Sequence, residues 1–282
     1  GIKNETMEKK RAALVLAGGG ARGIAHIGAI EELYAAGYEV TAVAGTSMGA
    51  LVGGMFASGH LALFKEWLCG LDARKVFDLV DLAWSTEGLV KGDRVMGALG
   101  ELVTDRPIEQ LPIPFAAVAT DVVTGEEVVL DRGSLYEAIR ASISIPSVFR
   151  PVRRDGRILV DGAAVNPMPL DRVQRTPGDN LVAVDVSARY SDAPERRSCT
   201  SLNHYQMLHS ASEIMQQRIT QLMCRLHRPD LLVELPTDSF GVFEFYRAAE
   251  IVEAGRRATR AALRALERSQ RQSSLRERPI PA

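Results

Sequence analysis

The chain has 282 residues, of which 46% are hydrophobic and 24% are charged, and this balance excludes a disordered or fibrous protein. It contains 34 Lys and Arg residues against 35 Asp and Glu residues, which gives a formal net charge of -1. No general positive field therefore attracts nucleic acid, and we expect no nucleic-acid partner.

The amino-terminal part of the chain alternates predicted strands and helices. An apolar run at residues 12–17 predicts a strand, and a glycine cluster separates it from an amphipathic helical pattern at 24–36. A second strand pattern at 40–44 leads through Gly45 into an apolar helical pattern that ends near Ser58. Two consecutive strand–turn–helix units predict a parallel sheet covered by helices.

The remainder of the chain adds further strands and two long helices. Apolar strand patterns lie at residues 115–120, 127–130, 158–160, 181–186 and 231–235. The pair Thr124-Gly125 predicts a hairpin, and hence an antiparallel neighbour in the sheet. Helical patterns cover 202–226 and 243–266, and we expect the polar tail at 269–282 to fray. No linker or repeat divides the chain, so we predict a single domain over residues 7–268.

The sharpest motif is Gly45-Thr46-Ser47-Met48-Gly49, which lies where a predicted strand passes into a predicted helix. A nucleophile elbow needs glycines on both sides of its serine, because the turn is tight and brings the strand and the helix close together. The serine hydroxyl would lie at the amino end of the helix, where negative charge is stabilised. The alternative is that Ser47 only caps the helix.

A glycine cluster, Gly18-Gly19-Gly20-Ala21-Arg22-Gly23, follows the first predicted strand. It matches the spacing of a dinucleotide-binding loop, but no acidic residue ends the next strand to hold a ribose. Consecutive glycines can instead turn backbone N–H groups toward an oxyanion, with Arg22 adding charge or fixing the loop. A tight turn that only packs a helix on a strand is the remaining alternative.

A serine nucleophile needs a base, and the five histidines are poorly placed for that role. A triad histidine is expected late in the chain after a strand, whereas His204, His209 and His227 fall in or at the end of a helical pattern. His26 lies one turn into the helix after the glycine cluster, where packing or an indirect hydrogen bond is the expected role.

Asp161 is the better candidate for the base. It ends an apolar strand pattern and precedes Gly162, Ala163 and Ala164, small residues that permit close approach. An apolar, water-poor site raises the pKa of a carboxylate from its ordinary value of about 3.9 and makes it a stronger base. A simple Asp-Gly turn is the alternative.

Together these three motifs resemble the patatin-like phospholipase family, including its bacterial-type members. Supporting blocks follow in the same order: Ala25-His26-Ile27-Gly28, Ala119-Thr120-Asp121 with Thr124-Gly125, Ser144-Ile145-Pro146, Phe149-Arg150-Pro151 and Asn166-Pro167. The resemblance covers residues 12–186. It departs mildly at Asp161-Gly162-Ala163, where Ala163 follows in place of a second glycine.

The resemblance implies a three-layer α/β fold, with a mainly parallel central sheet covered by helices and a helical carboxy-terminal elaboration. It implies a lipid acyl hydrolase (phospholipase, lysophospholipase or esterase) with Ser47 as nucleophile, Asp161 as base, and Gly18, Gly19, Gly20 and Arg22 as the oxyanion loop. No metal or other cofactor is expected. The alternatives are a histidine-triad esterase and a catalytically silent protein that binds a lipid or a nucleotide.

Two segments bear on the lipid partner. Apolar residues after the elbow helix predict either core packing, which we favour, or an acyl-binding wall or lid; they are Trp67, Leu68, Val76, Phe77, Leu79, Val80, Leu82, Trp84, Leu89 and Val90. The arginine-rich helix at 243–266 fits a solvated helix held by surface ion pairs, such as Glu253 with Arg257, better than one that contacts a membrane.

Features of the whole chain indicate its compartment. Three widely spaced cysteines fit a reduced compartment, and residues 1–11 lack the apolar run of a secretory signal. The longest apolar stretch, at 42–57, is shorter than the roughly 20 residues that span a bilayer. We therefore expect a cytoplasmic protein, with peripheral contact at the inner membrane surface as a secondary expectation. The sequence leaves the oligomeric state open.

Overall fold

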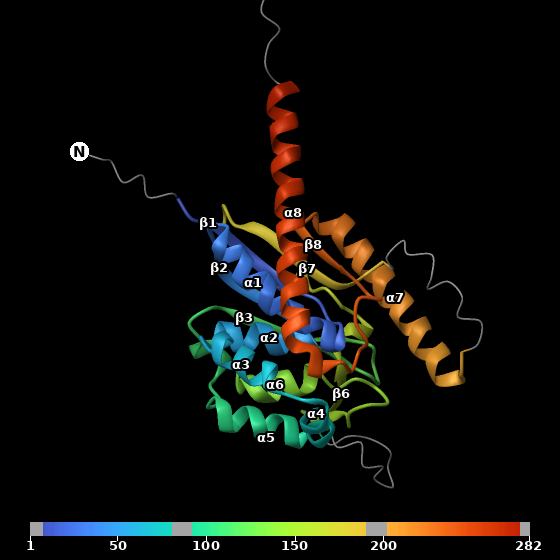
Figure 1. The fold of residues 1–282 in the computed structure, drawn as a ribbon. Coiled ribbons are helices and arrows are strands. Elements are labelled where there is room, and N and C mark those ends of the chain that lie inside the picture. Colours follow the sequence, from blue (N-terminus) through green and yellow to red (C-terminus); the bar gives the residue numbers. More distant parts are fainter. Residues whose placement is uncertain (1–7, 81–91, 190–201, 277–282) are drawn as a thin grey trace, which may run out of the picture.

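A computed structural model describes residues 8–80, 92–189 and 202–276 of the chain. Figure 1 shows a central sheet covered by helices. Within the described ranges hydrogen bonds link each strand to the next in the series β5 (Val152–Arg154), β6 (Arg157–Asp161), β3 (Phe115–Asp121), β2 (Tyr38–Thr46), β1 (Lys10–Leu16), β7 (Asn180–Ala188) and β8 (Leu231–Pro236). Strand β4 (Glu127–Leu130) also pairs with β3. The predicted three-layer α/β fold is confirmed.

The sheet is parallel from β3 through β2, β1 and β7 to β8, and antiparallel where β4, β5 and β6 pair. The predicted hairpin is confirmed, because β3 and β4 are antiparallel neighbours joined through Gly125, which has a φ of 76°. The short strand β5 escaped sequence reasoning, because Val-Arg-Arg carries no apolar alternation.

The longer helices are α1 (Ala25–Ala35), α2 (Met48–Ala57), α3 (Leu61–Cys69), α4 (Ala73–Val80), α5 (Asp93–Leu102), α6 (Leu135–Ser142), α7 (His204–His227) and α8 (Ala248–Arg276). Short 3-10 turns η1 (Gly20–Ile24), η2 (Ile108–Gln110), η3 (Gly162–Ala164) and η5 (Phe245–Arg247) join them. In the described part of the chain, every helix is either too short or too polar to span a lipid bilayer.

Alternate residues of β1 divide the interior into two cores, because successive side chains of a strand point to opposite faces. Leu14 and Leu16 face a large core that takes in residues of α1, α2, α6 and α8. Val15 and Ala17 face a small core with Met168 and partly buried side chains of α7. The second face of the sheet is therefore covered thinly, by α7 and the segment after η3.

Helices α1 and α8 lie side by side (Figure 1) and cross at two glycines. A Cβ at Gly28 would overlap the backbone of Val252, and a Cβ at Gly255 would overlap the backbone of Ala25. Only the absence of side chains at both positions allows this close approach.

Gly255→Ala is therefore expected to lower the free energy of unfolding by about 1–3 kcal/mol, because the added methyl forces the helices apart. Gly97→Ala is the matched control: Gly97 lies in α5 with nothing within 4 Å of an added Cβ. The control is expected to be neutral or to gain up to about 1 kcal/mol from helix propensity. Urea denaturation measures both, and an equal effect of the two substitutions would contradict the close crossing.

The arginines of α8 reach across to α1 rather than pairing mainly along their own helix. Arg256 pairs with Glu31, and Arg260 pairs with Glu32 at 3.0 Å. The helix also extends to Arg276, beyond the point where fraying was predicted to begin at residue 269. The residues between Ser269 and Arg276 tolerate a helix, because the first proline after them is Pro279.

Candidate active site

Ser47 occupies a tight turn between β2 and α2. Its backbone has φ 55° and ψ −123°, a region that residues with side chains rarely adopt. A Cβ at Gly45 or Gly49 would overlap backbone atoms of Gly49 or Leu16, so both flanking positions require glycine. The Ser47 N–H donates to Ser142 Oγ at 2.8 Å. Ser142 ends α6, so this hydrogen bond ties the strained backbone of Ser47 to that helix.

Strand β3 brings Ser47 and Asp161 together. Ala117 pairs with Gly45 of β2 and with Leu130 of β4, so these two strands occupy opposite edges of β3. Two residues further on, Ala119 pairs with Val128 of β4 and with Asp161 of β6, so β6 shares its edge with β2. The last β2 pair is Thr46 with Val118. The ends of β2 and β6 therefore meet at consecutive positions of one edge.

The Asp161 carboxyl is buried, with 5% of the residue exposed, and its Oδ1 accepts a hydrogen bond from the Ala163 N–H at 2.8 Å. Burial raises the pKa of Asp161 to about 6, and hydrogen bonds from the Ser47 side chain and the Ala163 backbone oppose that rise. The strand end is fixed from both sides, because Thr120 Oγ1 donates to the Asp161 carbonyl at 2.9 Å and the Asp161 N–H donates to Ser144 O.

The glycine loop passes beside this pair. A Cβ at Gly18 would lie 3.4 Å from Ser47 Cβ and 3.8 Å from Ala163 Cβ. The Gly18 N–H donates to Pro167 O at 3.1 Å, and its carbonyl accepts from Ser187 Oγ at 3.2 Å. Among the described residues, no acceptor engages the N–H groups of Gly19 and Gly20.

Ser187 sets the direction of the Gly19 N–H. The C=O and N–H groups of a trans peptide point in opposite directions. The Gly18 carbonyl points to Ser187 on β7, so the Gly19 N–H points away from β7. Because β1 lies between β7 and β2, Ser47 at the end of β2 lies on the opposite side of β1 from Ser187.

Arg22 is buried, and its guanidinium donates hydrogen bonds to acceptors within the protein. It donates to Val186 O at 2.9 Å, Phe240 O at 3.3 Å and Ser187 Oγ at 3.1 Å, and it pairs with Glu213 of α7 at 3.2 Å. These contacts fix the glycine loop against β7 and α7.

Two histidines lie near the site. His26 Nε2 is 2.7 Å from the Ala17 carbonyl, and burial lowers the pKa of His26 to about 4. The neutral ring therefore donates to the strand end that precedes the glycine loop. His209 of α7 lines the same cleft as Ser47, stacks on Tyr205 and lies 3.6 Å from Glu213. Neither ring makes a hydrogen bond to Ser47 among the described contacts.

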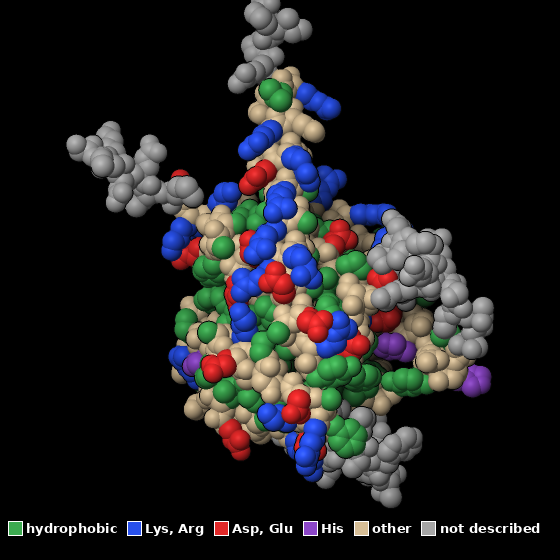
Figure 2. Space-filling view, in the orientation of Figure 1, with side chains coloured by type: hydrophobic (Ala, Val, Ile, Leu, Met, Phe, Trp, Pro, Cys, Tyr) green, Lys and Arg blue, Asp and Glu red, His purple; other side chains and the backbone are tan. Residues whose placement is uncertain are grey.

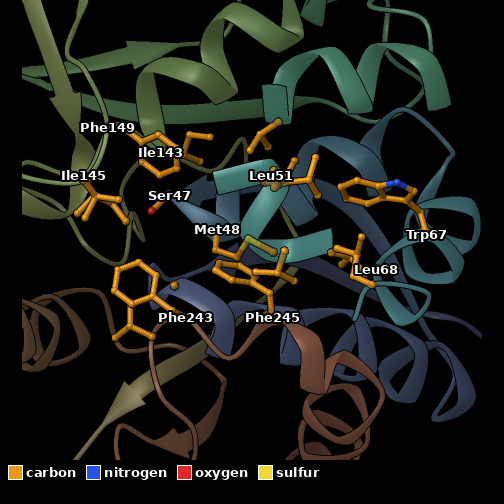
Figure 3. A pocket seen from close by; sticks show the side chains of 17 residues that line it. Ser47, Met48, Leu51, Trp67, Leu68, Ile143, Ile145, Phe149, Phe243 and Phe245 are labelled. Atoms are coloured by element: carbon orange, nitrogen blue, oxygen red, sulfur yellow. The ribbon is translucent and has the colours of Figure 1, made fainter. Parts of the chain in front are cut away.

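Two hollows meet at Ser47. One is an apolar pocket that runs from Ser47 past Met48 and Leu51 to Trp67 and Leu68 (Figure 3). The other is a cleft, partly open to solvent, whose lining includes Ser47, Asp161 and both polar and apolar side chains of α7. A molecule with an apolar chain and a polar end can therefore lie across Ser47.

Four of the apolar residues after the elbow helix line this pocket: Trp67, Leu68, Val76 and Leu79. Phe77 is exposed, and the side chains of Val80, Leu82, Trp84, Leu89 and Val90 lie outside the described residues. The pocket's other walls, from Ile143 to Phe149 and from Val242 to Phe245, were not predicted. Those segments gave no local signal, because only the fold brings them beside α2.

Sequence reasoning also missed Ser142 and Ser187, whose partners lie 95 and 169 residues away in the chain. A contact of that sequence separation leaves no local pattern. In the described ranges, no cluster of three His, Cys, Asp or Glu side chains could hold a metal ion.

Comparisons with known proteins place the chain among related sequences. The family model described as patatin-like phospholipase matches residues 14–173. An uncharacterized NTE family protein of Mycobacterium tuberculosis is 31% identical, over 91% of this chain and 92% of its own length. Mouse patatin-like phospholipase domain-containing protein 7 is 29% identical, over 86% of this chain and 20% of its own length. The crystal structure of VipD from Legionella pneumophila covers 92% of this chain and 67% of its own, with a TM-score of 0.48 and 16% identity.

Proposed function

Because the chain belongs to the patatin-like phospholipase family, we propose that it is a serine acyl hydrolase in which Ser47 attacks a lipid ester and Asp161 is the base. Family membership supports hydrolysis of lipid esters. The observation that carries the residue assignment is the register of β3, which brings the ends of β2 and β6 to adjacent positions of one edge. The strained turn at Ser47 and the buried carboxyl at Asp161 are arranged around that point.

In the proposed reaction, the Ser47 hydroxyl attacks the ester carbonyl carbon while Asp161 takes its proton. The carbonyl oxygen becomes an oxyanion, which the N–H groups of Gly19 and Gly20 stabilise. The ester C–O bond then breaks, and the leaving alcohol takes the proton from Asp161. Asp161 next deprotonates a water molecule that attacks the carbonyl carbon of the acyl-enzyme. The bond between that carbon and Ser47 Oγ then breaks, Asp161 returns the proton to Ser47 Oγ, and the fatty acid leaves.

The proposed roles within the loop differ from residue to residue. Gly18 supports the loop through its bonds to Pro167 and Ser187, and Arg22 is a positioning residue that braces the loop. Gly19 and Gly20 supply the donors. His26 supports Ala17 rather than acting as a base, since its Nε2 proton is engaged by that carbonyl.

The two hollows suggest how the substrate lies. The acyl chain occupies the apolar pocket between Ser47 and Trp67, and the polar part of the ester lies in the cleft beside α7. Hydrolysis of nitrophenyl esters of increasing acyl length tests this proposal. We expect activity to rise with chain length until the pocket is filled, and absence of hydrolysis at every length would contradict the proposed function.

Leu51→Phe is expected to shift this preference toward shorter chains. Leu51 lines the pocket between Ser47 and Trp67, so a larger side chain there shortens the space for an acyl chain. We expect the kcat/KM ratio of long over short esters to fall by about tenfold. Leu275→Phe, at an exposed position of α8, is the control and leaves the ratio unchanged. An unchanged ratio in Leu51→Phe would place the acyl chain elsewhere.

Ser187→Ala is expected to lower kcat by about tenfold with little change in KM, because the Gly18–Gly19 peptide loses the bond that directs its N–H. Ser187→Thr keeps the hydroxyl and should restore most of the rate. If Ser187 only stabilised the fold, Ser187→Ala would lower the Tm and leave kcat unchanged.

A further inference from the structure

Helix α7 carries an unusual share of its apolar side chains in solvent. Of its 24 residues only Thr220 is buried. Its large apolar side chains Met207, Leu208, Ile214, Met215 and Leu222 are 55% to 68% exposed, and we call this set the α7 rim. The spacing of seven residues between Met207 and Ile214, and between Leu208, Met215 and Leu222, aligns the rim along one face of the helix.

The α7 rim borders the entrance to the cleft that contains Ser47. Leu208 and Met215 belong both to the rim and to the cleft lining. Across the cleft, Phe243 is 50% exposed and also lines the apolar pocket. Figure 2 shows hydrophobic side chains gathered between the lower end of α8 and the lower end of α7. An apolar path therefore runs from the outer surface to Ser47.

Helix α7 carries more positive than unpaired negative charge. Its one carboxylate, Glu213, pairs with the buried Arg22. Arg218 and Arg225 are exposed on the same helix. Arg218 follows Ile214 by four residues and Arg225 follows Leu222 by three, so both arginines lie on the same face of the helix as the α7 rim. An exposed face that combines apolar side chains with arginines suits the boundary between lipid headgroups and acyl chains, where arginine keeps its charge in the headgroup layer. Because the net charge of the whole chain is -1, the chain as a whole is not attracted to an anionic lipid layer.

We propose that the α7 rim is the surface on which the protein docks to an anionic lipid layer, with the cleft entrance facing the lipid. This inference rests on the proposed function, because the lipid ester of that proposal would come from the same lipid layer. A second copy of the chain fits the rim less well. A second α7 would bring more arginine and no free carboxylate, and it would cover the cleft entrance.

Helix α8 is a poorer candidate for the same role. Its arginines Arg256 and Arg260 already pair with carboxylates of α1, and Leu275 is its one exposed large apolar side chain among the described residues. Of these two helices, α7 is therefore the one expected to reach lipid, and the ion pairs of α8 agree with the solvated helix that the sequence favoured.

Vesicle flotation tests the proposal with vesicles of phosphatidylcholine alone and of phosphatidylcholine mixed with phosphatidylglycerol. We expect the wild-type chain to float with the mixed vesicles. Met207→Asp combined with Ile214→Asp should weaken that binding by about tenfold or more, because both side chains would leave the apolar layer. Neither residue lines the cleft, so hydrolysis of a short soluble ester should persist.

Leu275→Asp is the matched control, with the same change of polarity at an exposed position of α8, and should bind like the wild type. Arg218→Gln with Arg225→Gln should reduce binding to the mixed vesicles and leave binding to phosphatidylcholine alone unchanged.

Equal flotation of the wild type and the Met207/Ile214 variant, or no flotation of the wild type, would overturn the proposal. So would a wild-type dimer in sedimentation that the variant abolishes, which would assign the rim to a second copy. Loss of soluble-ester hydrolysis in every form would instead count against the proposed function.

Discussion

Ser47→Ala should reduce ester hydrolysis by about 10³-fold or more, because the remaining site can bind a substrate and stabilise an oxyanion but has no nucleophile. The loss should appear in kcat, since the walls of the apolar pocket and the cleft remain. Steady-state kinetics with a soluble nitrophenyl ester measures it.

A second substitution at the same position separates chemistry from strain. Ser47 holds a φ of 55°, which glycine adopts without cost. Ser47→Gly should therefore be as inactive as Ser47→Ala, and more stable than Ser47→Ala by about 1 kcal/mol. Residual activity within tenfold of wild type in either variant would contradict the assignment of Ser47.

Asp161→Asn should lower kcat/KM by about 10³-fold near neutral pH, because the amide cannot accept the serine proton. In the wild-type protein the carboxyl must be ionised to act, and burial raises its pKa to about 6. The kcat/KM of the wild type should therefore fall as the pH drops below about 6. Asp161→Asn should lack this acidic limb.

The same pKa predicts the sign of a stability change. A carboxyl with an ordinary pKa of 3.8 that rises to about 6 in the folded state binds its proton more tightly when folded. The free energy of unfolding should fall as the pH rises from about 4 to about 6, by as much as about 3 kcal/mol. Asp161→Asn removes this loss, so the inactive variant should be more stable than the wild type at neutral pH.

Asp185 supplies a matched control for this prediction. It is a second buried carboxyl of the same cleft, and burial raises its pKa to about 6 as well. Asp185→Asn should give a similar gain in stability and keep the acidic limb of the activity profile. If that limb disappeared in Asp185→Asn and survived in Asp161→Asn, the titration would belong to Asp185, and the proposed role of Asp161 would be contradicted.

The elements that the sequence predicts best are those with local signals. The strand at 12–17, the glycines around Ser47 and the strand end at Asp161 each depend on residues within a few positions, so their patterns are readable without the fold. The hairpin at Gly125 is of the same kind. The fold then assembles these pieces through the register of β3, which no local pattern contains.

The parts that could not be predicted depend on distant contacts. Ser142 and Ser187 are ordinary serines in the sequence, and their roles arise from partners on other elements. The apolar pocket combines α2 and α3 with loops near residues 145 and 243, so no single segment shows its shape. The sequence of α7 predicts an ordinary long helix, and its apolar face is seen to be exposed only in the folded chain.

Covalent labelling with a fluorophosphonate, followed by mass spectrometry of the labelled peptide, tests the central claim most directly. We expect one adduct at Ser47 in the wild-type protein, none in Ser47→Ala and slow labelling in Asp161→Asn. His26→Ala and His209→Ala, if folded, should label at Ser47. An adduct that survives Ser47→Ala would contradict the account, as would labelling that depends on either histidine and is indifferent to Asp161→Asn.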